Sequence, residues 1–415
     1  MKTATTFFRS RWVETPNHVT ELEPRLLPQG FRAAGVAAGI DPAGLDVGVI
    51  ASDEPDTASA ARFTSNARVG APVVVTREAR LDGLRAVAAN SGCSNTGDGR
   101  RGLETAVAMQ AAAAEELGIE PDRVAVASTG VIGVELPRDK VVAGVRAACG
   151  ALTTDADDFS QAILTSDAGP KRACLEVTVP GGTVRLAAQA KGAGMISPRY
   201  ATTFCFVQTD AALDAETLDL LTGVCVKRSF DRISVDGQLS TSDTVVTMAN
   251  GASGVRIEPE SPAELAFGEA LDALLRQLAL EIVHDGEGAR RVGRLVVTGR
   301  PDLVEPVARS VANSPLVKTA LHGGDPNFGR ILQAAGQVWP PGEPFIADLE
   351  IEGRQLVSAG DAIGLDLDEL RSLEGLVQGD EVEYTLTLPG EGGETEVFFS
   401  DLSPEYVHFN AEYTT

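Results

Sequence analysis

A stretch near the middle of the chain, residues 191–206, constrains the fold most strongly. It reads Lys-Gly-Ala-Gly-Met-Ile-Ser-Pro-Arg-Tyr-Ala-Thr-Thr-Phe-Cys-Phe. Two glycines one residue apart permit a tight turn with positive φ, the proline prevents a helix, and residues 203–207 have the apolar character of a strand. Lys191 therefore enters a turn, and Thr202 stands where the turn becomes a strand, which suits a hydroxyl presented into a cleft. The alternative is an ordinary connection between two strands with a solvated lysine.

The composition excludes several classes of protein. Of the 415 residues 43% are hydrophobic, enough for a large core, and no apolar run is long enough to span a membrane. Residues 1–11 lack the apolar centre of a secretion signal, so we expect a cytoplasmic protein. With 35 basic and 59 acidic residues the net charge is −24. This charge disfavours nucleic acid and acidic membranes as partners, but it does not exclude a small anionic substrate.

Neither the cysteines nor the acidic residues predict a metal site. The cysteines are odd in number, widely spread and without CxxC spacing, which predicts free thiols in a reducing compartment: Cys93, Cys149, Cys174, Cys205 and Cys225. Asp236 and Asp243 lie in a polar cluster and are oxygen donors, but the spacing of an EF-hand is absent. We therefore expect no metal ion.

Short apolar segments bounded by turn residues alternate along the chain without a steady βαβ period or an internal repeat. Strands are expected at residues 47–51, 72–76, 85–89, 124–127, 203–207, 229–236, 345–351, 381–388 and 396–400. Helices are expected at residues 103–117, 215–225, 262–284 and 303–311, the third because Leu265, Leu271, Leu274, Leu275, Leu278 and Ile282 recur at helical spacing. Residues 28–40 read as an extended segment, and residues 401–415 as a strand and a tail. The pattern predicts a mixed α/β (α+β) fold of layered sheets covered by helices.

Two short motifs have the composition of a catalytic or binding site. Residues 128–133, Ser-Thr-Gly-Val-Ile-Gly, follow a predicted strand, and the backbone amides of such a turn can point together at one oxygen, as an oxyanion hole requires. The alternative is a plain turn from strand to helix. Residues 285–289, Asp-Gly-Glu-Gly-Ala, follow the long helix, where an acidic residue opposes the helix dipole and so has another reason to be present. These acids are either solvated or used to bind a ligand.

These motifs resemble, in the same order along residues 28–415, those of the glutamate N-acetyltransferase (ornithine acetyltransferase) family. The family has Lys-Gly-(Ser/Ala)-Gly-Met-Ile followed by Ala-Thr, an identical Ser-Thr-Gly-Val-Ile-Gly, and Asp-Gly-Glu-Gly-Ala. Residues 162–171 resemble its Ile-Met-Thr-Thr-Asp-Thr-x-Pro-Lys, and the chain ends with a similar Asn-Ala-Glu-Tyr-Thr-Thr. Two departures are a shorter polar loop at residues 90–97 and Phe328 in place of a tryptophan. His322, the single histidine in a motif, is more typical of a structural role.

The resemblance implies a self-cleaving enzyme with a threonine nucleophile. Cleavage would fall between Ala201 and Thr202, and Thr202 would then attack the substrate. Its own free α-amine, with a pKa of roughly 7.7 to 8, would be the base. The resemblance assigns stabilisation of the oxyanion to Thr129 and Gly130.

The same resemblance implies the substrate contacts, the reaction and the assembly. Thr165, with Ser166 as the alternative, would bind substrate together with Lys191, Thr202, Glu287, Asn410 and Thr415. Glu287 would face the ammonium group of ornithine. The reaction would transfer an acetyl group from N2-acetylornithine to glutamate without a cofactor. The fold would be similar to that of N-terminal nucleophile hydrolases, with an α-chain of residues 1–201 and a β-chain of residues 202–415 that fold as one unit and assemble as an (αβ)2 heterotetramer.

Three alternatives stay open on the sequence. A relative acting on another acylated amino acid would explain Arg199-Tyr200 and Thr203-Phe204, where the family commonly has Asn-Met and Met-Leu. An uncleaved binding protein of the same fold is disfavoured, because Lys191, Thr202 and Glu287 are all present. A peptidase of related fold would usually carry serine as the nucleophile. The sequence also leaves open whether acetyl-CoA serves as a second donor.

Overall fold

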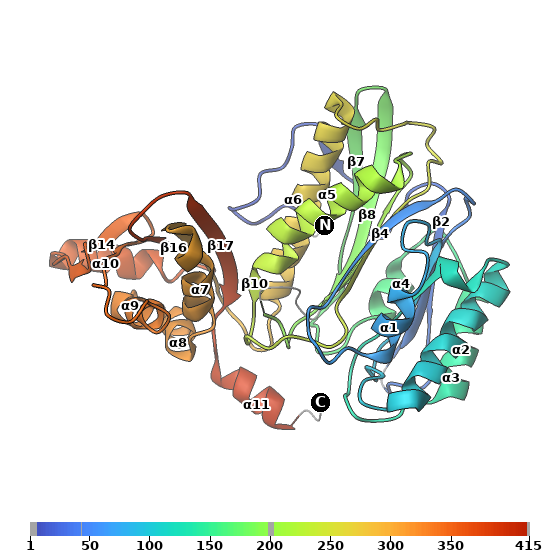
Figure 1. Ribbon diagram of the computed structural model, residues 1–415, viewed down its shortest axis with the longest axis horizontal. Coiled ribbons are helices and arrows are strands. Elements are labelled where there is room, and N and C mark those ends of the chain that lie inside the picture. The colour runs from blue at the N-terminus through green and yellow to red at the C-terminus, as the bar shows by residue number, and fades with distance from the viewer. Residues whose placement is uncertain (1–5, 43, 198–202, 413–415) are drawn as a thin grey trace, which may run out of the picture.

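Three β-sheets organise the part of the chain that the computed structural model describes, residues 6–42, 44–197 and 203–412 (Figure 1). The six-stranded sheet has the order β1 (Val19–Glu21), β7 (Lys171–Val179), β8 (Gly182–Lys191), β9 (Phe204–Thr209), β11 (Thr244–Ala249) and β4 (Ala58–Phe63). The four-stranded sheet has the order β2 (Phe31–Val36), β3 (Val47–Ser52), β5 (Ala86–Asn90) and β6 (Val124–Ser128). The predicted fold class, layered sheets covered by helices, is therefore confirmed.

The two sheets form the centre of a four-layer body. One face of the six-stranded sheet packs against α5 (Ala215–Arg228) and α6 (Pro262–His284). Its other face meets the four-stranded sheet through Phe204, Phe206 and Met248, with α4 (Asp157–Ala162) at this interface. The outer face of the four-stranded sheet is covered by three helices, α1 (Ala71–Arg77), α2 (Gly99–Leu117) and α3 (Arg138–Gly150). Burial of apolar side chains between these layers is the main source of their stability.

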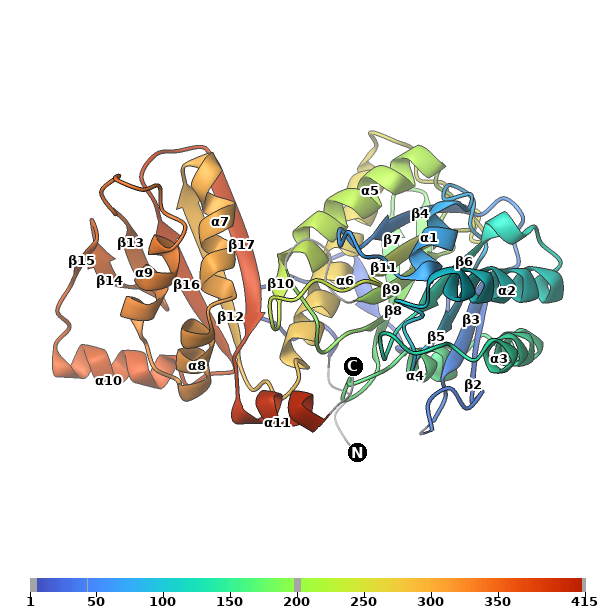
Figure 2. The same ribbon diagram turned by 60° about the horizontal axis from the view of Figure 1, so that its bottom comes forward.

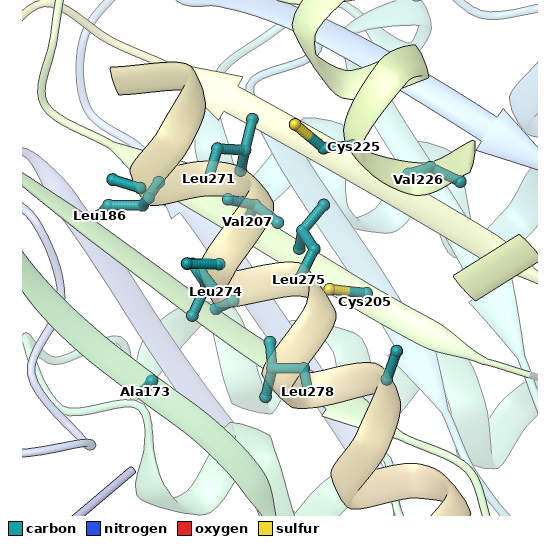
Figure 3. Packing of buried hydrophobic residues seen from close by; sticks show 14 of the residues in the cluster. Ala173, Leu186, Cys205, Val207, Cys225, Val226, Leu271, Leu274, Leu275 and Leu278 are labelled. Atoms are coloured by element: carbon teal, nitrogen blue, oxygen red, sulfur yellow. The ribbon is translucent and has the colours of Figure 1, made fainter. Parts of the chain in front are cut away.

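Helix α6 has the bounds that its leucine spacing predicted, Pro262–His284. It begins at Ser261, whose side chain accepts a hydrogen bond from the backbone N–H of Glu264. Leu271, Leu274, Leu275 and Leu278 face the six-stranded sheet, where they lie near Cys205 and Val207 of β9 (Figure 3). Leu265 is the exception, because its side chain is 67% exposed at the first turns of the helix.

The remaining elements form a smaller lobe around the seven-stranded sheet. Its order is β10 (Ile233–Ser234), β17 (Gly393–Ser400), β12 (Val292–Gly299), β16 (Glu381–Thr387), β13 (Asp348–Ile351), β14 (Arg354–Ser358) and β15 (Asp361–Ala362). A separate hydrophobic core lies between this sheet and its helices α7 (Pro301–Ala312), α8 (Pro315–Gly323), α9 (Phe328–Gly336) and α10 (Leu367–Leu376). The last helix, α11 (Pro404–Glu412), runs from the lobe toward the larger body in both views (Figures 1 and 2). None of the described helices is long and apolar enough to cross a membrane.

Three expected segments have another conformation. Residues 72–76 form most of helix α1 instead of a strand, because Pro72 can begin a helix and the valines pack against neighbouring helices. Residues 229–236 form a 3-10 turn, Phe230–Arg232, followed by the two residues of β10. The predicted C-terminal strand is helix α11. Its start carries an N-cap signal, because Ser403 precedes a proline and its side chain accepts a hydrogen bond from the N–H of Tyr406.

Candidate active site

A cavity of about 310 Å³ lies where the ends of both body sheets meet the lobe and α11. It is lined by all six described residues that the resemblance assigns to the site: Thr129, Gly130, Thr165, Lys191, Glu287 and Asn410. These residues come from five separate segments of the chain, since Thr129 and Gly130 are adjacent. The other three assigned residues, Ala201, Thr202 and Thr415, lie outside the described residues.

The turn after β6 presents a hydroxyl and a backbone amide. The backbone N–H of Thr129 donates to the carbonyl oxygen of Asn90 at 3.0 Å, so this amide is not available to an oxyanion. The Thr129 hydroxyl oxygen accepts a hydrogen bond from Lys191 at 3.3 Å, which leaves its own proton free to donate. The N–H of Gly130 has no hydrogen-bond acceptor among the described residues. The turn can therefore stabilise an oxyanion with one hydroxyl and one N–H, rather than with backbone amides alone.

Glycine is required at position 130 by its conformation and its neighbours. Its φ is +125°, and a Cβ atom there would lie 2.4 Å from the carbonyl carbon of Gly92. The polar loop that starts at residue 90 thus packs directly against the turn that contains Thr129 and Gly130. Cys93 pairs with Val131 in a short parallel bridge that holds the two loops together.

Lys191 is the last residue of β8, and its ammonium group is buried under the cavity. The Nζ atom donates to the hydroxyl of Thr165 at 2.6 Å and lies 3.7 Å from Oδ2 of Asp167. Burial lowers the pKa of Lys191, and the nearby carboxylate of Asp167 opposes this shift. The alternative of a solvated lysine is therefore wrong, because the side chain is only 3% exposed.

Glu287 extends from the loop after α6 and is held from two sides. Its backbone N–H donates to the carbonyl oxygen of Ala193 at 3.0 Å, and Asn410 donates from Nδ2 to its Oε2 at 2.7 Å. A Cβ atom at Gly194 would lie 2.5 Å from Oε1 of Glu287, so only glycine lets the carboxylate lie here. Glu287 and the buried Lys191 are close enough for the carboxylate to raise the pKa of the lysine. The cavity thus offers a carboxylate and an ammonium to the same ligand.

The glycine after Glu287 allows two segments of the chain to come close together. A Cβ atom at Gly288 would lie 2.7 Å from the hydroxyl of Ser403, so this glycine lets the loop pack against the start of α11. Asp285, the acid that opposes the helix dipole, pairs with Lys171 at 2.5 Å. This ion pair explains why an acidic residue stands at the C-terminal end of α6.

Two acidic residues of the polar cluster fix the backbone beside residues 198–202. Asp236 accepts hydrogen bonds from the N–H groups of Met195 at 2.6 Å and Ile196 at 2.9 Å. Asp243 accepts one from the N–H of Thr203 at 2.9 Å, and burial raises the pKa of its carboxyl group well above the usual value. Within residues 6–42, 44–197 and 203–412, no three His, Cys, Asp or Glu side chains lie close enough to hold a metal ion.

The sequence did not assign Asp236 or Tyr406 to the site, although both line the cavity. The hydroxyl of Tyr406 donates to Oδ2 of Asp236 at 3.4 Å. Tyr406 and Asn410 are four residues apart and therefore lie on one face of α11. Recognition of the helix start at Ser403-Pro404 would have revealed Tyr406 as a neighbour of the assigned Asn410.

Comparison with known proteins gives one consistent result. The model of the ArgJ family matches residues 32–415. A protein of Symbiobacterium thermophilum named Arginine biosynthesis bifunctional protein ArgJ is 42% identical over 396 residues, which cover 94% of this chain and 98% of the relative. A protein of the same name from Nitratidesulfovibrio vulgaris is 42% identical over 395 residues, 93% of this chain and 98% of the relative. Among solved structures, ornithine acetyltransferase from Mycobacterium tuberculosis in complex with ornithine is 35% identical, with a TM-score of 0.40, over 43% of this chain and 98% of the solved chain.

Proposed function

The chain belongs to the ArgJ family, and we propose that it transfers an acetyl group from N2-acetylornithine to glutamate in arginine biosynthesis. One observation carries the choice of substrate: a single cavity holds the buried ammonium of Lys191 and the carboxylate of Glu287. An amino acid with a second amino group has the complementary charges, since its α-carboxylate suits Lys191 and its side-chain ammonium suits Glu287. Both relatives are named as arginine biosynthesis proteins, which supports the same pathway for this chain.

The proposed reaction is a double displacement at Thr202. The Thr202 hydroxyl attacks the acetyl carbonyl carbon and gives its proton to the free α-amine of the same residue. The amide C–N bond breaks, ornithine leaves with that proton on its amine, and an acetyl ester remains on Thr202. The amine of glutamate then attacks the ester, forms the new amide and restores the hydroxyl. The Thr129 hydroxyl and the Gly130 N–H donate to the negatively charged oxygen in both steps.

We propose that self-cleavage precedes this reaction and leaves an α-chain of residues 1–201 and a β-chain of residues 202–415. The pairing of β8 with β9 and of β4 with β11 supports the expectation that both chains stay in one folded unit, because each pair joins a strand from either side of the cut. An (αβ)2 heterotetramer and a cytoplasmic location belong to the same proposal. Native mass spectrometry of the purified protein would measure the assembly.

The alternative that the enzyme acts on another acylated amino acid rests on Arg199-Tyr200 and Thr203-Phe204. The described part of this segment does not favour it. Phe204 packs against Phe206 in the core between the two body sheets, and neither Thr203 nor Phe204 lines the cavity. This departure from the family therefore has no direct route to a substrate. Arg199 and Tyr200 lie outside the described residues.

The test combines cleavage with transfer. Purified protein, incubated with acetyl-labelled N2-acetylornithine and glutamate, should yield labelled N-acetylglutamate and should run as two fragments, one beginning at Thr202. Thr202→Ala should remain a single chain without transfer activity. Thr203→Ala is the matched control, because its side chain is buried and its hydroxyl has no partner among the described residues; it should cleave and retain most activity. Cleavage in Thr202→Ala, or an active protein that is never cut, would disprove the assignment.

A further inference from the structure

A second carboxylate lies behind the cavity and contacts the groups that form its floor. Asp167 has a side chain with 0% exposure, and its two oxygens serve different partners. Oδ1 accepts hydrogen bonds from Lys171 at 2.7 Å and from the N–H of Gly192 at 2.6 Å. Oδ2 accepts one from the N–H of Thr165 at 3.1 Å and lies 3.7 Å from Nζ of Lys191.

This arrangement connects Asp167 to Thr165, one of the two residues that accept a hydrogen bond from the Lys191 ammonium group, and to the backbone next to Lys191. Asp167 fixes the backbone of Thr165, whose hydroxyl accepts a hydrogen bond from Lys191. It also fixes the backbone of Gly192, the residue directly after Lys191. Asp167 itself is not among the residues that line the cavity, so it acts on a substrate only through these neighbours.

We propose that Asp167 is a positioning residue for acetyl transfer, which holds the Lys191 ammonium against Thr129 and Thr165 so that it can bind the carboxylate of the substrate. The proposal rests on the function proposed above. Lys171 is the second cation on the same carboxylate, and Asp285 accepts from it on the far side. The four side chains form a row of alternating charge from the cavity floor to the end of α6.

The charged groups around Lys191 predict the direction in which its pKa should shift when each of them is removed. Burial lowers the pKa of Lys191, Asp167 raises it, Lys171 lowers it, and Glu287 and Asp243 raise it. Burial also acts against the charged form of Asp167, but Lys191 and Lys171 together hold the pKa of its carboxyl group well below the usual range. Loss of Asp167 should therefore make Lys191 lose its proton at lower pH, and loss of Lys171 should make it lose its proton at higher pH.

The experiment is the pH profile of kcat/KM for N2-acetylornithine in two variants. Asp167→Asn should reduce kcat/KM at neutral pH by about 10- to 100-fold, as expected for a hydrogen bond to a charged group, and should move the alkaline limb to lower pH. Lys171→Met should move that limb to higher pH. Asp219→Asn is the matched control, because Asp219 pairs with Arg62 at the surface at 2.6 Å, and its profile should coincide with that of the wild type.

The opposite signs separate positioning from a merely structural role, which would lower activity without moving the two profiles apart. If Asp167→Asn does not fold, Lys171→Met still tests the proposal, because an alkaline limb that does not move to higher pH would show that the charges around Lys191 do not set it and would overturn the proposal. Profiles that coincide with the wild type, or that shift in the same direction, would overturn the proposal while leaving the acetyl-transfer function intact. Absence of transfer in the wild type would instead overturn the proposed function.

Discussion

Lys191 and Lys318 are both buried lysines, but their surroundings differ in charge. Lys191 lies under the cavity with the carboxylate of Asp167 3.7 Å away. Lys318, on α8 of the lobe, donates to the carbonyl oxygen of Ser400 and lies 5.6 Å from the centre of the Phe399 ring. Among the described residues no carboxylate lies within ion-pair distance of it. Burial therefore lowers the pKa of Lys318 to about 7, against the opposing effect of Asp236 and Asp401.

Burial of a lysine therefore does not by itself indicate a binding site: Lys191 has a balancing carboxylate and lines the cavity, whereas Lys318 has neither property in the part of the chain that the structure describes. Around Lys318 the neighbouring groups serve packing between lobe and body. Ser400 also donates from its hydroxyl to the carbonyl oxygen of Val235 at 3.3 Å. His322 lies 2.7 Å from the buried Asp401 and outside the cavity, in agreement with the structural role expected for it.

The largest expected effect is on activity, and it separates the two lysines directly. Lys191→Met should reduce kcat/KM by about 100-fold or more, because the substrate carboxylate loses a charged hydrogen-bond donor. Lys318→Met should retain activity within a few-fold, since methionine fills a similar volume away from the cavity. Steady-state kinetics of both purified variants measures this contrast. Similar losses in the two variants would show that Lys191 is as structural as Lys318.

The opposite end of the cavity gives the next effect. If Glu287 binds the ammonium of ornithine, Glu287→Gln should weaken use of N2-acetylornithine by about 10- to 100-fold. Use of N-acetylglutamate in the reverse direction should fall much less, because that substrate has no second amine. Rates in both directions test this. An equal loss in both directions would assign Glu287 to the scaffold of the cavity.

A third prediction concerns the stability of the Lys318 region. The pKa of Lys318 is about 7 in the folded protein, compared with about 10.5 in the unfolded chain. Between pH 7 and pH 10.5 the unfolded chain therefore holds a proton that the folded chain lacks. The lysine therefore destabilises the fold below pH 7, and the penalty decreases as the pH rises from 7 toward 10.5. Relative to Lys318→Met, the free energy of unfolding of the wild type should rise by roughly 2 kcal/mol from pH 7 to pH 9. Denaturant unfolding at both pH values measures the difference, and parallel curves would contradict it.

The smallest effect is expected at Asn410, which supports Glu287 from α11. Asn410→Ala removes the 2.7 Å hydrogen bond to the carboxylate but leaves the charge in place. A neutral donor at an exposed position should be worth about 1 kcal/mol, or roughly five-fold in kcat/KM for N2-acetylornithine. His408→Ala, on an exposed face of the same helix, is the control. A loss as large as that of Glu287→Gln would instead support the direct contact with substrate that the resemblance implies for Asn410.

The family resemblance predicted which distant residues meet in the cavity, whereas local patterns alone predicted some elements correctly and others wrongly. The family resemblance is confirmed, and the leucine spacing of 262–284 gave the bounds of α6 because one continuous face is buried. In contrast, the valines of residues 72–76 suit a strand or a short buried helix equally. Packing against the surrounding layers, which the local sequence does not show, favours helix α1. The contact between Asp167 and Lys191 joins segments on either side of the β7–β8 hairpin, so no local pattern could have indicated it.

The sharing of the six-stranded sheet between both halves of the chain has a consequence for biogenesis. Strand β4 is an edge strand whose single partner in the described sheet is β11, with Phe63 opposite Thr244. During synthesis β4 therefore stays unpaired until β11, in the second half of the protein, has been made. Pairing between such distant segments slows folding. A ribosome that stopped near residue 201 would release a fragment with an open sheet edge. Genes that encode the two halves separately would consequently need to be expressed together, so that each product completes the sheet of the other.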